Sequence, residues 1–185
     1  MLHSSGPTLK PNRSRSSFLQ ERALLFDQVG DDQHSGEIHS HLGRVFGRLG
    51  PKMTVRRALL HLQRAEALLS KTSEEHSLGW LYWGLATSNL QTLHVYDALA
   101  ASQKAMEIFA RLGNRKSWTR AASNQIQYLM VKGKLAQAIG LIDEIVGAAS
   151  GLADPTAFKH VHSMCGWFWM LMRDTKQAMH IIDWV

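Results

Sequence analysis

Ten histidines and one cysteine are the side chains of this sequence best suited to metal binding or nucleophilic chemistry. Six of these residues gather in two short segments, which contain His34, His39 and His41, and His160, His162 and Cys165. A protein zinc site needs three or four ligands that converge tetrahedrally. Neither segment is joined by a second pair of ligands at a finger-like spacing, and side chains two residues apart on a helix point about 200° apart. We therefore expect ordinary helix-face histidines, with no metal ion and no cofactor.

Cys165 could act as a nucleophile only with a neighbouring base and an activating environment. It stands directly before Gly166, where we interpret it as a packing residue. The two adjacent carboxylates Asp143 and Glu144 point apart on a helix, and the sequence contains no G-x-x-x-x-G-K-[ST] phosphate loop. These patterns predict a protein that is not an enzyme, although an active site completed by a partner stays open.

The composition restricts the class of protein. The chain has 185 residues, a length typical of one domain, and 45% of its residues are hydrophobic. The longest apolar run, 167–172, is far too short to cross a bilayer, and we find no apolar core of a secretory signal. A single cysteine fits a reducing compartment. We expect a cytoplasmic protein without a membrane partner.

Basic residues are concentrated in two stretches, 44–64 and 111–134, which each hold six Lys or Arg residues and no acidic residue. Such stretches are typical of a solvated helix face. They also suit an acidic peptide, a phosphate group or an RNA backbone. Because we find neither a denser basic patch nor a known nucleic-acid module, nucleic acid is disfavoured as a partner.

The elements that position these side chains follow a fixed repeat. Alanine recurs every 40 residues, at Ala58, Ala98, Ala138 and Ala178, and the residues after these alanines are all apolar. A fixed period of this length indicates stacked supersecondary units. Second-helix residues of one unit also show helical spacing, with apolar side chains at i, i+3, i+4 and i+7 from Leu135 onwards.

Four helical hairpins are predicted, in units of about 36–71, 72–113, 114–152 and 153–185. We expect helices over 36–49, 54–70, 74–91, 94–111, 115–131 and 134–150, then one after Asp154 and Pro155 and a last one from Asp174. Thr72 and Glu75 form a predicted capping box, as do Asp174 and Gln177. Residues 1–16 are predicted to be a disordered basic tail, and one extra helix, capped by Ser17, is expected to end near Gly30 as the remnant of a preceding unit.

The chain resembles a tetratricopeptide repeat array. In that family a Trp, a Leu-Gly pair and an aromatic residue of the first helix precede a key Ala of the second. This pattern is echoed by Trp80, Trp83-Gly84 and Ala98, and again by Cys165-Gly166, Trp169 and Ala178, while Gly43 and Ala58 keep its small positions. The resemblance covers residues 17–185 and implies an all-α, right-handed α-solenoid of about four antiparallel hairpins. A period of 40, longer than the usual value of about 34, is similar to the C-terminal arrays of bacterial signalling ATPases and nucleotide cyclases.

The resemblance implies a non-catalytic scaffold that binds a peptide or helix of another protein in a concave groove lined by first helices, and an acidic peptide or helix is one candidate. The predicted groove residues are Arg44, Tyr82, Arg120, Asn124, Gln127, His160, Ser163 and Trp167. Two alternatives are a regulatory or sensor fragment of a larger signalling ATPase or cyclase, and an RNA-binding helical repeat. Because no polar cap follows the apolar helix that ends at Val185, we also expect this end to be incomplete or to self-associate.

Overall fold

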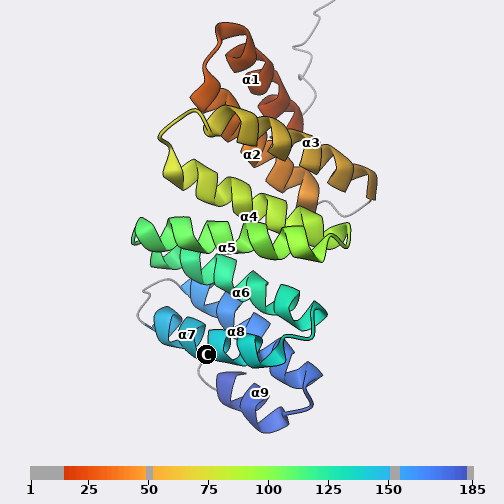
Figure 1. The fold of residues 1–185 in the computed structure, drawn as a ribbon, viewed down its shortest axis with the longest axis vertical. Helices are drawn as coiled ribbons and strands as arrows, with labels where there is room; N and C mark the ends of the chain where they lie inside the picture. Colours follow the sequence, from red (N-terminus) through yellow and green to blue (C-terminus); the bar gives the residue numbers. More distant parts are fainter. Residues whose placement is uncertain (1–14, 49–51, 151–154, 183–185) are drawn as a thin grey trace, which may run out of the picture.

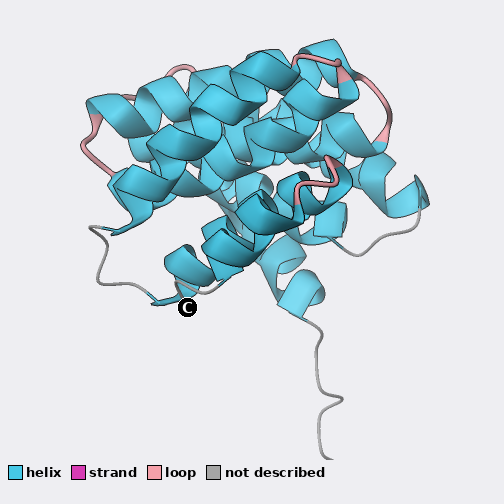
Figure 2. Ribbon diagram, turned by 90° about the horizontal axis from the view of Figure 1, so that it is seen from below, coloured by secondary structure: helices cyan, strands magenta, loops and turns pink. Residues whose placement is uncertain are grey.

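The computed structural model describes residues 15–48, 52–150 and 155–182. Within these ranges the chain forms helices and no strand (Figure 2). The helices are α1 (Arg15–Val29), α2 (Asp32–Arg48), α3 (Lys52–Leu69), α4 (Glu75–Gln91), α5 (Val95–Arg111), α6 (Arg115–Val131), α7 (Leu135–Ser150), α8 (Pro155–Leu171) and α9 (Thr175–Ile182). They follow one another along the longest axis of the molecule, from α1 at one end to α9 at the other (Figure 1).

Each described helix packs mainly on its neighbours in the sequence. The hairpins α2–α3, α4–α5, α6–α7 and α8–α9 form the units, and the first helices α2, α4, α6 and α8 also contact one another in turn. The second helices of these units are α3, α5, α7 and α9. Such nearest-neighbour packing makes the fold an all-α solenoid, as the sequence predicts.

The 40-residue period is a packing period. Ala58, Ala98 and Ala138 are fully buried in their second helices, and Ala178 is only 3% exposed. Only a small side chain fits where two helix backbones come this close together. The alanine spacing therefore fixes the same face of every second helix against the rest of the array.

The turns repeat as well. A residue with a left-handed backbone follows α4, α5, α6 and α8, with φ values of 65° at Leu93, 63° at Gly113, 67° at Gly133 and 58° at Arg173. At each turn its N–H bonds to the carbonyl three residues back, and the next N–H bonds to the carbonyl five residues back. This is the Schellman arrangement, which satisfies carbonyl groups that the helix end leaves without partners.

At the N-terminal end the predicted boundaries are wrong. Helix α1 begins at Arg15, so Ser17 lies inside this helix and is not its cap. The tail predicted over 1–16 is therefore helical in its last two residues. Helix α2 begins at Asp32 and not at 36. Gly30, with φ 75°, turns the chain, and the Asp31 carboxylate then accepts a hydrogen bond from the N–H of His34 at 3.0 Å, which caps α2 earlier.

Elsewhere α4 to α7 begin within one residue of their predicted starts, and α6 spans the predicted range. The Asp174 carboxylate accepts a hydrogen bond from the N–H of Gln177 at 3.1 Å, as predicted. Thr72 does not form the predicted capping box with Glu75: its hydroxyl donates to the Leu69 carbonyl at 2.9 Å and so caps the end of α3. Gly50, Pro51 and Asp154 lie outside the described residues.

Small residues of the first helices lie against large residues of their neighbours. A Cβ atom on Gly43 would lie 2.4 Å from Leu62 Cγ, and one on Gly84 would lie 2.9 Å from Leu62 Cδ2. Two further positions, Gly36 against Leu69 and Gly79 against Phe109, play the same role and were missed by the sequence pattern. Gly166 is buried too.

Candidate binding groove

Three consecutive first helices meet at one tryptophan. The guanidinium carbon of Arg44, from α2, lies 5.1 Å from the centroid of the Trp80 ring of α4. The guanidinium carbon of Arg120, from α6, lies 5.9 Å from a Trp80 ring centroid. Cation–π contacts of this length are attractive, and a guanidinium stacked on an indole keeps its N–H groups in a fixed plane. Two of the predicted groove residues are therefore brought together by an aromatic residue that the sequence had assigned only to the repeat signature.

The Trp80 side chain is fixed by contacts with His76, Trp83 and Phe109. Its indole N–H donates to Nε2 of His76 at 3.3 Å. Its ring makes edge contacts with Trp83 at 5.7 Å and with Phe109 at 5.3 Å, measured between ring centroids. Because Phe109 is fully buried, the indole rests on the core of the second unit. The position of Trp80 is therefore set before any ligand binds.

Beside Trp80 a cavity of about 580 Å³ opens between α1, α2 and α4. It is lined by Phe18, Leu19, Glu37, Ile38, Ser40, His41, Arg44, His76, Ser77 and Trp80. Such a volume is in the range of sites that hold a small molecule or a few residues of a peptide. The apolar wall comes from α1 and the polar groups from the two first helices, so the cavity offers both an anchor site and charge.

The cavity lining holds one carboxylate and one guanidinium, those of Glu37 and Arg44. The Glu37 carboxylate accepts hydrogen bonds from Ser77 Oγ at 3.3 Å and Gln33 Nε2 at 3.5 Å, so protein donors already engage it. The Arg44 guanidinium nitrogen Nη2 lies 3.3 Å from His41 Nδ1, so the cation and the imidazole are neighbours in the cavity wall. Arginine donors bind carboxylates and phosphates in charge-assisted, often bidentate, hydrogen bonds.

The comparisons with known proteins add no family. No protein-family model matches the chain, and no curated protein matches its sequence.

Tyr82 lies on the other side of α4 from this cavity. It lines a second cavity of about 480 Å³ between α3, α4 and α5, together with Glu66 and Lys104. The Lys104 ammonium nitrogen lies 4.8 Å from the Tyr82 ring centroid. Burial and the nearby Glu66 carboxylate raise the pKa of the Tyr82 phenol. Tyr82 is thus not brought together with Arg44 and Arg120.

The remaining predicted groove residues lie on α6 and α8. Asn124 is half-buried, and Gln127 donates to Met164 Sδ at 3.7 Å, which joins the two helices. Ser163 is exposed, Trp167 is 45% exposed, and the side chain of His160 lies outside the described part.

The sequence analysis missed the centre of the groove. Trp80 stands 36 residues after Arg44 and 40 residues before Arg120, so an aromatic residue between two arginines at about one period was the available signal. His76, four residues before Trp80, follows from helical spacing alone. The cavity wall formed by Phe18 and Leu19 has no comparable signal, because it depends on how α1 packs.

The histidine and cysteine segments do not converge on a metal site: within the described residues no three His, Cys, Asp or Glu side chains are grouped in that way. His162 and Cys165 are buried. Burial and the Asp143 charge raise the pKa of the Cys165 thiol to about 12, so this thiol stays protonated at neutral pH. Among the described helices, none is long and apolar enough to cross a membrane.

A polar cluster joins α1, α2 and α3 at the N-terminal end. His39 Nδ1 and His61 Nδ1 are 2.8 Å apart, and His39 Nε2 lies 3.4 Å from the Asp27 carboxylate. Ser35 donates to the same carboxylate at 2.5 Å, and Arg64 lies 3.5 Å from it. Burial opposes ionisation of Asp27, but hydrogen bonds from Ser35 and His39 hold the pKa of its carboxyl below the ordinary value. We interpret this cluster as the polar contact that docks α1 on the first unit.

Proposed function

We propose that this protein is a non-catalytic, tetratricopeptide-like scaffold whose first-helix groove binds an acidic peptide or helix of another protein. The observation that carries the proposal is that Arg44 and Arg120 both lie within 6 Å of a Trp80 ring, so that three successive first helices contribute to one place. Under this proposal the arginines bind the acidic group of the ligand and the apolar wall of the cavity receives its anchor side chain.

Two physical arguments support this assignment. Solenoids present extended surfaces built from equivalent helices, so one ligand segment contacts several units at once. Binding energy at such surfaces is concentrated in a few Trp, Tyr and Arg residues. We further propose a cytoplasmic location, because the single cysteine fits a reducing compartment.

The proposal is tested with short fluorescent peptides that share one Phe anchor and differ in the number of Glu residues. Binding is measured by anisotropy for the wild type, Arg44→Glu and Arg120→Glu. We expect the acidic peptides to bind the wild type, and each charge reversal to weaken binding at least tenfold, equivalent to about 1.4 kcal/mol. Arg57→Glu, an exposed position on the second helix α3, is the matched control and should bind like the wild type.

Two outcomes would contradict the proposal. One is equal affinity for acidic and neutral peptides, which would remove the role of the arginines. The other is tight, steeply salt-dependent binding of single-stranded RNA that the same two charge reversals abolish. That result would favour the RNA-binding alternative.

A further inference from the structure

Helix α1 occupies the place of a second helix. It begins at Arg15, while α5, α7 and α9 begin at Val95, Leu135 and Thr175, so the starts differ by multiples of 40 residues. On one side α1 packs on α2, where Leu19 is half-buried as its equivalents Leu59, Leu99 and Ile139 are. Ala23 is also buried there, although its equivalents Gln63, Gln103 and Asp143 are exposed. A second helix normally has a first helix on its other side.

The positions that would face such a first helix are exposed in α1. Counting back 40 residues from Ala58, Leu62, Ala65 and Leu69 gives Phe18, Arg22, Leu25 and Val29. In α3, α5 and α7 all twelve equivalent residues are at most 2% exposed: Ala58, Leu62, Ala65, Leu69, Ala98, Ser102, Ala105, Phe109, Ala138, Ile142, Ile145 and Ala149. In α1, by contrast, Phe18 is 52%, Leu25 60% and Val29 79% exposed.

The first helices of this chain show what covers such a face. Gly36 lies against Leu69, Gly43 against Leu62 and Gly79 against Phe109, each so close that a Cβ atom would come within 3 Å of the large side chain. The equivalents of Leu69 and Phe109 in α1 are both Val29. A helix that packs on this exposed face of α1 therefore needs Gly or Ala where it comes closest to Val29. It needs apolar side chains at its other positions that contact α1.

The preceding sequence does not match that description. Residues 1–14 contain Pro7 and Pro11 and lack the apolar spacing of the 17-residue first helices.

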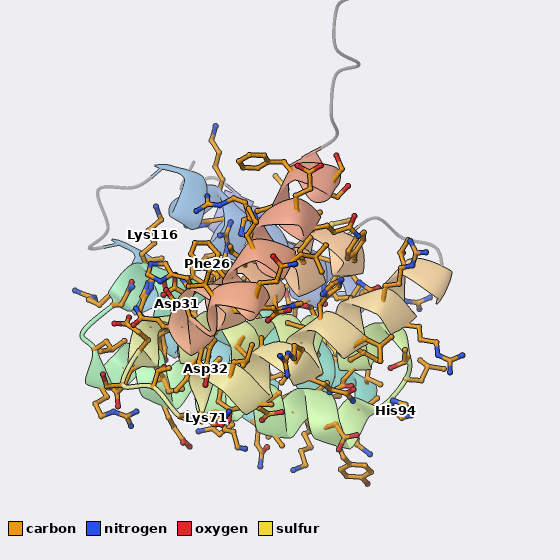
Figure 3. All side chains as sticks on the ribbon, turned by 90° about the horizontal axis from the view of Figure 1, so that it is seen from above. Phe26, Asp31, Asp32, Lys71, His94 and Lys116 are labelled. Atoms are coloured by element: carbon orange, nitrogen blue, oxygen red, sulfur yellow. The ribbon has the colours of Figure 1, made fainter. Side chains whose placement is uncertain are left out.

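Seen from the α1 end, α1 lies across the near side of the array, with the turn from Phe26 to Asp32 at its end (Figure 3). The exposed stripe of α1, formed by Phe18, Arg22, Leu25 and Val29, is thus equivalent to the faces that second helices bury against first helices inside the array.

Arg22 distinguishes between possible occupants. It stands in the middle of the stripe, where the other second helices have Leu62, Ser102 and Ile142. Its guanidinium carbon lies 5.8 Å from the Phe18 ring centroid and 5.6 Å from that of Phe26, so it is part of this surface. A two-fold contact between copies places the same patch against itself, and would bring two Arg22 cations together. A foreign helix with a carboxylate at that level instead pairs with Arg22.

We propose that the Phe18–Leu25–Val29 face of α1 binds an amphipathic helix of a partner protein. This helix packs as a first helix does, with Gly or Ala at the closest approach and an acidic residue beside Arg22. The site shares Phe18 with the wall of the cavity beside Trp80, whereas Leu25 and Val29 do not line that cavity. The variants that test it therefore change Leu25.

The full-length chain is tested first with a labelled peptide of the sequence Glu75–Gln91, the first helix of the second unit, carrying Ala86→Glu. Packing of Gly79 at Val29 places position 86 at the level of Arg22. We expect the wild type and Leu24→Asp to bind this peptide alike, and Leu25→Asp to bind at least tenfold more weakly. Leu24 is the matched control because it is 62% exposed, as Leu25 is at 60%, yet its equivalent in α3 is the exposed Arg64. Equal binding by both variants would overturn the proposal.

A tethered probe keeps the test decisive if the isolated peptide is too weakly helical to bind. The segment Glu75–His94, again with Ala86→Glu and joined directly to Arg15 of the chain, places a first helix and its turn at the right register, because His94 precedes a second helix in the second unit. We expect this graft to raise the urea midpoint, and Leu25→Asp but not Leu24→Asp to cancel the rise. A graft without effect overturns the proposal, as does wild-type self-association that Leu25→Asp abolishes, since a second copy would then be the occupant.

Discussion

First and second helices of this array obey the repeat to different degrees. In the second helices, Leu69 and Phe109 are equivalent at a separation of 40 residues and both are fully buried. The first-helix glycines that pack on them, Gly36 and Gly79, are 43 residues apart. From α4 onward, the first helices begin 40 residues apart, at Glu75, Arg115 and Pro155. The buried positions of the second helices therefore keep the period throughout, whereas the first helices depart from it by three residues between α2 and α4.

The difference follows from what each kind of helix contacts. In α3, α5 and α7 the alanine face is fully enclosed, so any shift along the axis would bring large side chains against backbone. The first helices carry the groove on one side, where Trp80 and Arg120 are only part-buried. A helix with one open side tolerates a shift of register, and its open side is where binding chemistry is found.

The largest expected effect is on the enclosed alanines. Ala98→Leu and Ala138→Leu should each lower the free energy of unfolding by about 1–3 kcal/mol, because both sites are fully buried and overpacking forces neighbours apart. Urea denaturation measures this change. Ala100→Leu and Ala136→Leu, on exposed positions of the same helices, are the controls and should stay near the wild type. Unchanged midpoints in the buried variants would mean that the period is not a packing period.

Glycines offer a smaller contrast between the two kinds of helix. Gly43→Ala in α2 should destabilise the protein, because its Cβ would lie 2.4 Å from Leu62 Cγ and 3.0 Å from the Ala58 carbonyl oxygen. Gly140→Ala in α7 meets nothing within 4 Å and should stabilise it, through helix propensity, by up to about 1 kcal/mol. Thermal unfolding of both variants checks the signs. Stabilisation by Gly43→Ala would show that the close approach in the first unit is not real.

The turns between the two helices of a unit give a third test, with an effect of about 0.5–1 kcal/mol. Leu93 and Gly133 adopt the same left-handed backbone at equivalent turns, with φ of 65° and 67°. Because a side chain is strained there and Leu93 is 81% exposed, Leu93→Gly should stabilise the protein. Gly133→Ala should destabilise it. Calorimetric midpoints that move in the same direction for both variants would contradict this explanation.

The smallest expected effect is a pH dependence at the contact between a first and a second helix. Burial, then the charges of His39 and Arg57, lower the pKa of His61 below its ordinary 6.5. The unfolded chain therefore binds a proton at His61 more readily than the folded chain does. Stability should fall as the pH drops below about 6.5, and His61→Gln should reduce that fall. Urea midpoints measured between neutral and mildly acidic pH decide, and identical slopes for both proteins would exclude this role of His61.

Sequence periodicity was sufficient for most of the fold and for little of the site. The alanines at 40-residue intervals and the turn residues Gly113 and Gly133 predicted α5, α6 and α7 within a residue, because helical propensity and packing agree there. The start of α2 was missed since Asp31 caps it after a glycine turn, a local signal that the repeat does not contain. Arg44 and Arg120 were predicted for the groove, but Tyr82 points to the second helices. A shift of two residues on a helix changes the face, and the first-helix register was not defined by the period.

The nearest-neighbour packing of the described helices also determines how the chain folds. No described helix has to wait for a segment from the far end of the sequence, so the loop-closure entropy that precedes each contact is small. Low contact order of this kind goes with folding in microseconds to milliseconds. Unfolding should likewise start at the outer helices and proceed inward, so amide hydrogens in α5 and α6 should exchange last. A molecule built in this way loses its ends first while its middle remains folded.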